Sequence, residues 1–340
     1  MTPSFRFRRI GAGKDPCCTA YSYGCGRFLP VSVLLDKRLV VVMGKGGVGR
    51  TTVAASLGLA AARAGKRVMI AEVAQQERLS RVFRREGVGY SETKLSDNFY
   101  AMSVDPQRAL DEYLSQQIPG PLSGALLHNR IFEYFVAAAP GVRELTTIGK
   151  VWELAQLDRK YGSTEQYDLV ILDAPASGNG LALLQAPRTF GEIARVGPIR
   201  RRADMIHDFL RDPARTGVVS VAIPQEMPVN ETIEFREKLG EEMGIDVDAV
   251  VVNQLLPERF TSEEAEQIDA VNGNHGADEV AAALRAALSE HRRARSQRVQ
   301  LRRLKKEVGE VVTLPFLWDP ELTLEDFERL ADELERKLDL

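Results

Sequence analysis

A glycine-rich turn that directly follows a short apolar run constrains the fold of this chain more than any other feature. The run, residues 39–43, has the composition of a parallel strand that is buried on both faces. The turn consists of Gly44, Lys45, Gly46, Gly47, Val48, Gly49, Arg50, Thr51 and Thr52. Its glycines let the backbone turn tightly and point N–H groups at phosphate oxygens. The sequence therefore predicts a phosphate-binding loop at this position.

The residues after this loop complete a strand–helix–strand unit. We expect a helix over 51–64, ended by Gly65, and a second strand over 67–71. The helix adds the positive end of its dipole to the loop. Thr51 occupies the hydroxyl position that binds Mg²⁺ in loops of this kind. This context makes a nucleotide the expected ligand.

Other apolar runs indicate further strands along the chain. Two are strong, 169–172 and 249–252, and two are weaker, 218–222 and 311–314. Strands that alternate with helical segments predict an α/β fold with a mostly parallel sheet and helices on both faces. Together with the loop, this pattern predicts the P-loop NTPase fold.

Asp173 directly follows the strong apolar run 169–172. The carboxyl ends of parallel strands form the edge at which such sheets bind ligands. An aspartate in this place beside a phosphate-binding loop is the usual partner of Mg²⁺, although a strand-terminal aspartate by itself is as often a helix cap. The combination with the loop predicts that Thr51 and Asp173 bind Mg²⁺ together.

The chain of 340 residues is expected to contain one large domain, residues 34–340. Residues 1–33 lack periodicity and are expected to form a disordered leader. This leader holds all three cysteines, Cys17, Cys18 and Cys25. Their spacing fits no zinc pattern, so the sequence predicts no metal site there.

The segment 105–160 differs from the rest of the predicted domain. It contains several aromatic residues and is broken by two Pro-Gly steps. We interpret it as a helical insertion on the ligand side of the sheet. Its aromatic side chains fit either core packing or a groove for a peptide.

Charge and hydropathy exclude some classes of function. The formal net charge of −3 argues against general attraction to nucleic acid, so no stable nucleic-acid complex is expected. Residues 291–306 hold eight Lys or Arg and no acidic residue. A basic helix of this kind can bind the phosphates of DNA, but the overall charge favours the interpretation as a solvated helix face. No stretch approaches the roughly 20 apolar residues of a transmembrane segment, and no signal peptide is apparent. A cytoplasmic location is therefore expected.

Lys45, the second residue of the loop, stands where an ordinary phosphate-binding loop needs no lysine. In this respect the chain resembles the deviant Walker A class of P-loop ATPases. The stretch from Asp173 to Asn179 is similar to switch II of the ArsA-like ATPases, with Asn179 in place of the family's histidine. The segment 224–232 is also similar, and the resemblance spans roughly residues 36–335. It points to the bacterial anion-transporting ATPase branch, whose relatives include arsenite pumps and the ATPases that target tail-anchored proteins.

The resemblance implies an ATP-binding, Mg²⁺-dependent protein that works as a dimer. In this class the early lysine reaches across the dimer interface to the partner's phosphates, a role that falls to Lys45. Asn253 matches the family's adenine-contacting asparagine, and Pro315 and Phe316 lie in its second base-contacting loop. The chain holds a single copy of the domain, so its partner is either a second copy or a related ATPase chain. The expected client is a protein.

Two departures from the family concern hydrolysis. Arg50 replaces the lysine that precedes the two threonines, and the planar guanidinium is not interchangeable with a compact ammonium group. Ala74 stands where the family has the aspartate that orients the attacking water. Loss of such a group typically lowers the rate by about 10²–10⁴. Glu72 and Glu77 lie nearby and either replace this carboxylate or form a solvated pair.

The sequence therefore leaves two functions open. One is a nucleotide-driven dimeric switch that hydrolyses ATP and acts on a protein client. The other is a catalytically impaired pseudo-ATPase subunit that binds nucleotide and completes a heterodimer with an active chain. Arg50 and Ala74 favour the second function, and the intact loop is compatible with both.

Overall fold

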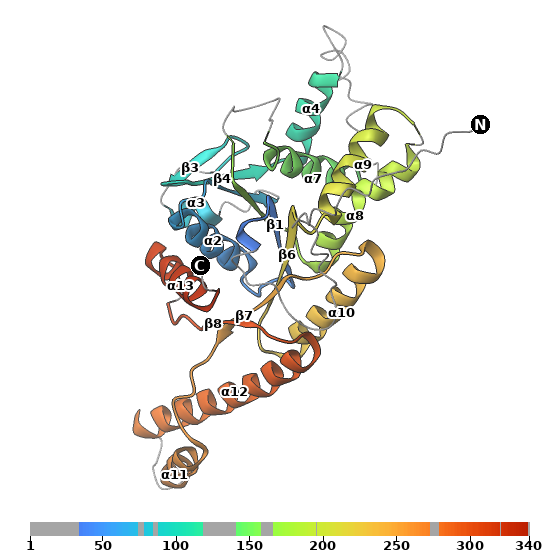
Figure 1. Cartoon of the computed structure of the whole chain (residues 1–340). Helices are drawn as coiled ribbons and strands as arrows, with labels where there is room; N and C mark the ends of the chain where they lie inside the picture. The colour runs from blue at the N-terminus through green and yellow to red at the C-terminus, as the bar shows by residue number, and fades with distance from the viewer. Residues whose placement is uncertain are drawn as a thin grey trace, which may run out of the picture.

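The computed structural model of the chain has one eight-stranded sheet between two layers of helices (Figure 1). It describes residues 34–73, 78–83, 88–117, 141–157, 166–194, 196–272, 279–319 and 321–338. The expected leader 1–33, with its three cysteines, lies outside the described residues and stays a prediction.

The sheet is mostly parallel. Its strands are β1 (Leu39–Gly44), β2 (Val68–Val73), β3 (Thr93–Ser96), β4 (Phe99–Val104), β5 (Leu169–Asp173), β6 (Thr216–Ala222), β7 (Ala249–Leu255) and β8 (Val312–Pro315). Their order across the sheet is β3-β4-β2-β5-β1-β6-β7-β8, and only the β3–β4 pair is antiparallel. The α/β fold with a mostly parallel sheet, predicted from the sequence, is thereby confirmed.

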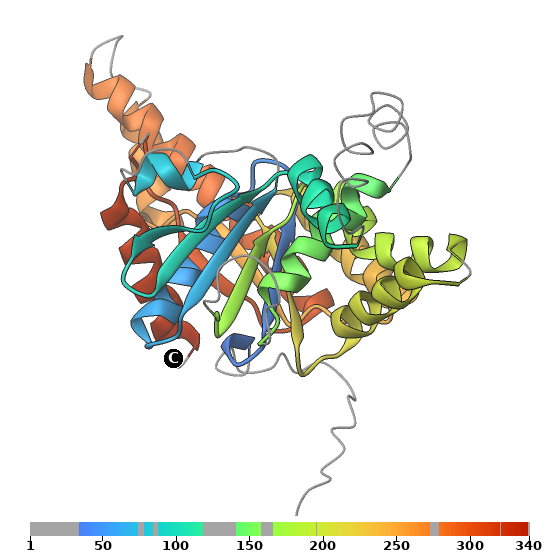
Figure 2. The ribbon, with the colours of Figure 1, turned by 90° about the horizontal axis from the view of Figure 1, so that it is seen from above.

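Helices cover both faces of this sheet, as the view from above shows (Figure 2). One face packs against α2 (Arg50–Arg63), α3 (Arg78–Val82) and α13 (Leu324–Leu338). The other face packs against α7 (Val142–Leu154), α8 (Ser177–Ile193), α9 (Pro198–Arg211), α10 (Glu226–Met243) and the end of α12 (Glu279–Val308). Two helices lie further out: α4 (Pro106–Gln117) packs on α7, and α11 (Ser262–Asn272) packs on α12.

The burial of β1 explains why its sequence is a continuous apolar run. Val40 and Val42 belong to the core on the α2 side, whereas Val41 and Met43 belong to the core on the α8 side. Successive side chains of a strand point to opposite faces, so a strand covered on both faces is apolar at every position. The same reasoning applies to β5, where Leu169–Asp173 is buried throughout.

The sequence predicts no strand between residues 72 and 168, but the structure has β3 and β4 there. β3 is a short edge strand in which three of four residues are polar, and its register with β4 shifts between Lys94 and Ser96. β4 mixes Tyr100 and Ser103 with apolar residues. Neither segment shows the continuous apolar run by which the other strands are recognised.

Within the segment 105–160 the structure describes α4 and α7. Ile148, Val151 and Leu154 of α7 lie fully buried against the sheet, so within the connection from β4 to β5 it is α7 that packs on the sheet, with α4 outside it. Residues 118–140 and 158–165 lie outside the described residues, and a separate helical insertion stays a prediction. None of the helices that the structure describes is long and apolar enough to span a membrane.

Candidate functional site

The glycine-rich loop joins the end of β1 to the start of α2, and its glycines are required by close contacts. A Cβ atom on Gly44 would lie 2.3 Å from the carbonyl oxygen of Val221, and one on Gly49 would lie 2.3 Å from Nδ2 of Asn253. Gly49 also has a φ of 86°, in the left-handed region that favours glycine. The loop is therefore packed closely against residues of β6 and β7.

The outer side of the same loop is open. A Cβ atom on Gly46 or Gly47 would meet no atom within 4 Å. Gly49 is the N-cap of α2 and has no side chain to accept hydrogen bonds from the first-turn N–H groups, which leaves those donors to a ligand. Open space next to backbone donors at a helix N-terminus fits a bound phosphate group.

Thr51 and Asp173 meet directly beneath the loop. The Thr51 hydroxyl donates a hydrogen bond of 2.6 Å to Oδ2 of Asp173, and both side chains are buried. Asp173 reaches this place because β5 lies next to β1, with Val42 opposite Asp173 in the register. The structure brings together the two residues that the sequence predicts as Mg²⁺ ligands. A hydroxyl and a carboxylate are oxygen donors of the kind that Mg²⁺ prefers.

A second carboxylate lies beside Asp173. Glu72 is opposite Asp173 in the β2–β5 register, and its side chain is only 1% exposed. Val68 and Ile70, which share the alternation of Glu72, face the α2 side of the sheet, so Glu72 points toward the same side as Asp173. The interpretation of Glu72 as part of a solvated pair is therefore wrong. Ala74 and Glu77 lie outside the described residues.

Lys45 forms an ion pair within its own chain. Its Nζ lies 2.5 Å from Oε1 of Glu231 on α10, and the two side chains are about a third exposed (36% and 32%). The sequence does not identify Glu231 as a site residue, although it lies in the segment 224–232 that resembles the family. The two residues are 186 positions apart, so only the fold brings them together.

Arg50 does not point freely into the open side of the loop. Its Nη1 donates a hydrogen bond to the carbonyl oxygen of Ala174, the residue directly after Asp173. The guanidinium therefore connects the start of α2 to the segment that resembles switch II. Thr52, the next-but-one residue, is partly buried in the first turn of α2.

Asn253, near the end of β7, holds the loop through a hydrogen bond. It is 4% exposed, and its Nδ2 donates a 3.0 Å hydrogen bond to the carbonyl oxygen of Val48. Its Oδ1 accepts a hydrogen bond from the backbone N–H of Gln254, which has a φ of 59°. The structure thus gives Asn253 a contact with the loop itself. Its contact with adenine stays a prediction.

Pro315 and Phe316 lie at the end of β8, next to β7. Pro315 is opposite Leu255 in the register, and the backbone N–H of Phe316 donates a 3.0 Å hydrogen bond to the Leu255 carbonyl. The Phe316 ring packs edge-to-face on Trp318 at 5.0 Å, and Trp318 is half exposed. The sequence does not identify Trp318, an aromatic surface that lies at the same sheet edge as Asn253.

A comparison with known protein families identifies the family to which the glycine-rich loop and the strands around it belong. The model of one family, described as anion-transporting ATPase, matches residues 37–202 and 198–276, which include β1, the loop, Asp173 and Asn253. The chain belongs to the anion-transporting ATPase family. The family predicted from the sequence is thereby confirmed, and with it the P-loop character of the fold.

Curated relatives agree with this assignment. ATPase BagA of Mycobacterium tuberculosis is 28% identical over 263 residues, which cover 75% of this chain and 76% of the relative. ATPase GET3 of Kluyveromyces lactis is 28% identical over 258 residues, 64% of this chain and 72% of the relative. The arsenical pump-driving ATPase of Acidiphilium multivorum is 27% identical over 240 residues, 65% of this chain and 40% of the relative.

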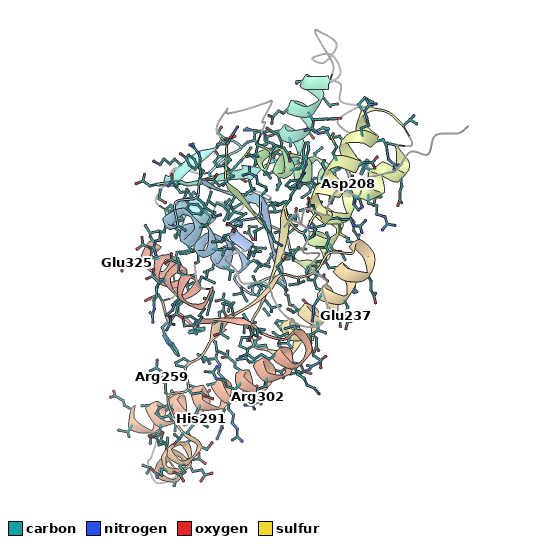
Figure 3. The ribbon with its side chains drawn as sticks, viewed as in Figure 1. Asp208, Glu237, Arg259, His291, Arg302 and Glu325 are labelled. Atoms are coloured by element: carbon teal, nitrogen blue, oxygen red, sulfur yellow. The ribbon has the colours of Figure 1, made fainter. Side chains whose placement is uncertain are left out.

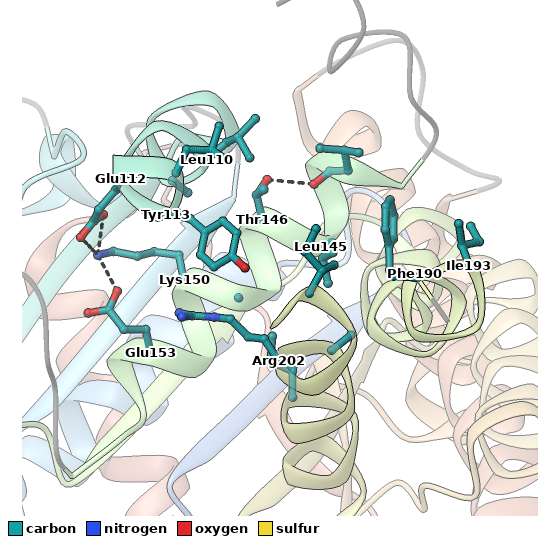
Figure 4. Close-up of a pocket in the computed structure, with 18 residues that line it drawn as sticks. Leu110, Glu112, Tyr113, Leu145, Thr146, Lys150, Glu153, Phe190, Ile193 and Arg202 are labelled. Atoms are coloured by element: carbon teal, nitrogen blue, oxygen red, sulfur yellow. Dashed lines mark hydrogen bonds and ion pairs between the residues drawn. The ribbon is translucent and has the colours of Figure 1, made fainter. Parts of the chain in front are cut away.

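This anion-transporting ATPase family member also has an apolar pocket outside the nucleotide loop (Figure 4). The pocket lies between α4, α7, α8 and α9 and has a volume of about 420 Å³. Its apolar walls include Leu110, Leu145, Phe190, Ile193 and Ile206. A pocket of this size and character is typical of sites that bind an apolar group.

The polar part of this pocket is internally paired. Lys150 donates to Glu112 at 2.9 Å and to Glu153 at 2.7 Å, and Tyr90 donates to Glu112 at 2.6 Å. Burial and the hydrogen bond to Glu112 raise the pKa of the Tyr90 phenol above its ordinary value. Arg202 lies over the ring of Tyr113 at 4.9 Å. With two cations against two carboxylates, the pocket favours neither anions nor cations.

Proposed function

We propose that this chain is an ATP-binding, Mg²⁺-dependent switch protein that closes as a dimer and acts on a protein client. Its family supports ATP-dependent activity. The observation that carries the proposal is the buried Thr51–Asp173 hydrogen bond directly beneath an open glycine loop. A hydroxyl and a carboxylate held in this way are ready to bind Mg²⁺ next to the loop that receives phosphates.

The residues for each part of the ligand follow from this geometry. The N–H groups of the loop from Gly46 to Gly49 and the first turn of α2 would bind the phosphates. Thr51 and Asp173 would bind Mg²⁺, and the aromatic Phe316 at the sheet edge would lie near the base. When bound, ATP supplies a phosphoanhydride bond whose cleavage drives the change of shape.

The dimer in this proposal rests on Lys45. In the single chain this lysine is paired with Glu231 at the surface, close to the loop, so a partner chain can approach it. The apolar pocket between α4 and α9 supports a protein client with an apolar segment. The partner is either a second copy of the chain or a related ATPase, and a cytoplasmic location stays a prediction.

Glu231→Gln is expected to strengthen nucleotide-dependent association by two- to fivefold. The exposed Lys45–Glu231 pair is worth up to about 1 kcal/mol, and this energy must be given up before Lys45 can turn to the partner's phosphates. Sedimentation with a non-hydrolysable ATP analogue measures the dissociation constant. Glu234→Gln, an exposed glutamate on the same helix, serves as control. Weaker association of Glu231→Gln would mean that Glu231 contributes to the interface instead.

A second candidate function is a pseudo-ATPase subunit. It is favoured by the hydrogen bond from Arg50 to the Ala174 carbonyl, which directs the guanidinium to the backbone of the segment resembling switch II. Ala74, at the place of the water-orienting aspartate, supports the same function. Such a chain would bind nucleotide and supply Lys45 to an active partner.

Steady-state ATP turnover separates the two functions. If the chain is an autonomous enzyme, it hydrolyses ATP and Lys45→Ala removes the activity. If it is a pseudo-ATPase, it binds ATP without turnover, and Arg50→Lys combined with Ala74→Asp raises turnover by at least 100-fold, within the range for a restored catalytic carboxylate. Nucleotide affinity is measured in parallel for every variant, so that a binding defect is not mistaken for a catalytic one. Absence of nucleotide binding in the unmodified chain would contradict both functions.

A further inference from the structure

The long helix α12 lies outside the residues that the family model matches. The family match ends at residue 276, and α12 covers Glu279–Val308. Its end is anchored in the core by Leu301, Leu304 and Val308. Its beginning extends beyond the sheet together with α11, as an arm of the molecule (Figure 1).

A basic stripe runs along the solvent side of this helix. It consists of Arg292, Arg295, Arg302, Arg303 and Lys306, all exposed. At 3.6 residues per turn these five positions lie within roughly 100° of one another, on the side opposite to the buried Leu301 and Leu304. The stripe is about 21 Å long at 1.5 Å per residue. Figure 3 shows Arg302 and His291 among the side chains of this helix.

The charges of the stripe are not neutralised by the rest of the described chain. Among the described residues, none forms an ion pair or a side-chain hydrogen bond with the five members of the stripe. Neighbouring Arg298, by contrast, bonds to Glu258 and to the Leu256 carbonyl. Nine Lys or Arg against three Glu give α12 a charge of +6, whereas the whole chain carries −3.

The concentration of positive charge on α12 changes the expectation, drawn from the net charge, that the chain does not bind nucleic acid. Averaged over the chain, the charge repels polyanions, but the five cations of the stripe share one exposed face of α12, whereas most acidic residues of the arm lie on α11, which carries Glu263, Glu264, Glu266 and Asp269. Debye screening at physiological salt limits the repulsion from the body to about 8 Å. A polyanion that touches the stripe and stays clear of α11 therefore meets five cations with no carboxylate among them.

We propose that the basic stripe of α12 binds the phosphate backbone of a nucleic acid. Four of its five members are arginines, whose planar forks bind phosphate oxygens in pairs. The stripe is narrow and linear, as a row of phosphates is. A helix that binds a membrane surface presents a broad apolar face, and Val299 is the single large apolar residue within the stripe. These features favour a nucleic acid over an anionic membrane.

The stripe is also connected to the nucleotide site. Gln297, between Arg295 and Arg302, accepts a hydrogen bond from the N–H of Leu256 at 2.8 Å and donates one to the Gln254 carbonyl at 3.2 Å. Gln254 directly follows Asn253, which braces the phosphate loop. A ligand on the stripe would therefore contact the same helix, α12, that holds the backbone of Gln254 and Leu256 next to Asn253.

The test is the salt dependence of binding of a labelled 20-base-pair duplex to the full chain, measured by fluorescence anisotropy. Five phosphate contacts predict a slope of log K against log salt of roughly −4.5. Arg295→Ala with Arg302→Ala is expected to reduce the magnitude of this slope by about two. The matched control is Arg201→Ala with Arg329→Ala, two exposed arginines on α9 and α13, which should leave the slope unchanged.

Vesicles that contain 30% phosphatidylglycerol are titrated in parallel. Binding to vesicles without binding to the duplex would overturn the proposal in favour of an anionic membrane. No duplex binding at 50 mM salt, or a slope that the α12 variant does not alter, would also overturn it. The melting temperature and nucleotide affinity of each variant are measured to verify that the fold is intact, since the substituted side chains are exposed.

Discussion

Gly49→Ala is expected to lower the affinity for ATP and Mg²⁺ by at least 100-fold. The new Cβ would lie 2.3 Å from Nδ2 of Asn253, a distance that no folded protein tolerates, and the φ of 86° is itself strained for alanine. Asn253 is buried and bonded to the Val48 carbonyl, so it cannot simply rotate away. The loop must therefore move, and its N–H groups lose the orientation that binds phosphate. Isothermal titration calorimetry with ATP and Mg²⁺ measures the loss.

Gly240→Ala is the matched control for this substitution. Gly240 lies in the last turn of α10, far along the chain from the loop, and a Cβ there meets no atom within 4 Å. Alanine stabilises a helix interior by roughly 1 kcal/mol relative to glycine, so this variant should bind ATP normally and melt no earlier than the parent. An affinity of Gly49→Ala within threefold of the parent would contradict the idea that the loop must keep its present shape to bind phosphate.

Asp248→Ala is expected to reduce the free energy of unfolding by about 3–5 kcal/mol, the cost of leaving a buried charge without its partner. Asp248 pairs with the ammonium group of Lys37, which is only 2% exposed and also donates to the Thr216 carbonyl at 3.3 Å. The same carboxylate accepts a 2.8 Å hydrogen bond from the N–H of Val218. It therefore joins the segment before β1 to β6 and to the entrance of β7. Chemical denaturation measures the change.

Two further variants test the cause of this loss. Asp246→Ala removes an exposed aspartate two positions away and should change the free energy of unfolding by less than about 0.5 kcal/mol. Lys37→Met combined with Asp248→Leu removes both charges together. It should recover much of the loss, because an apolar pair of similar volume often replaces a buried ion pair without destabilisation. Equal destabilisation by the single and double changes would assign the effect to packing rather than to charge.

The sheet was predictable where each strand carries its own signal. β1, β5 and the start of β7 are covered on both faces, so each of them is a continuous apolar run in the sequence. β3 and β4 were not predictable, because an edge strand needs few apolar residues and β4 includes Tyr100 and Ser103. The place of β4 in the sheet depends on its pairing with β2, and that of β3 on its pairing with β4, contacts that no local pattern reveals.

The site was predictable in its local parts and not in its long-range pairs. The loop residues are contiguous and Asp173 ends an obvious strand, so both were expected at the edge formed by the carboxyl ends of the parallel strands, where the structure has them in contact. Glu231 is an ordinary exposed-looking glutamate in the sequence, and only the position of α10 beside the loop makes it the partner of Lys45. The burial of Glu72 depends on its neighbours on other elements, which the sequence does not show.

The order of strands has a consequence for how the chain is made. β1 pairs with β5 on one side and with β6 on the other, so its hydrogen bonds are complete only after residues 216–222 have left the ribosome. Both edges of β1 are exposed until β5 has emerged, and the edge that pairs with β6 stays exposed until residues 216–222 follow, a state that promotes aggregation. Biosynthesis of this protein therefore requires that nascent β1 be shielded until well over half of the polypeptide has been translated, and nascent chains released before β6 should be substrates for chaperones.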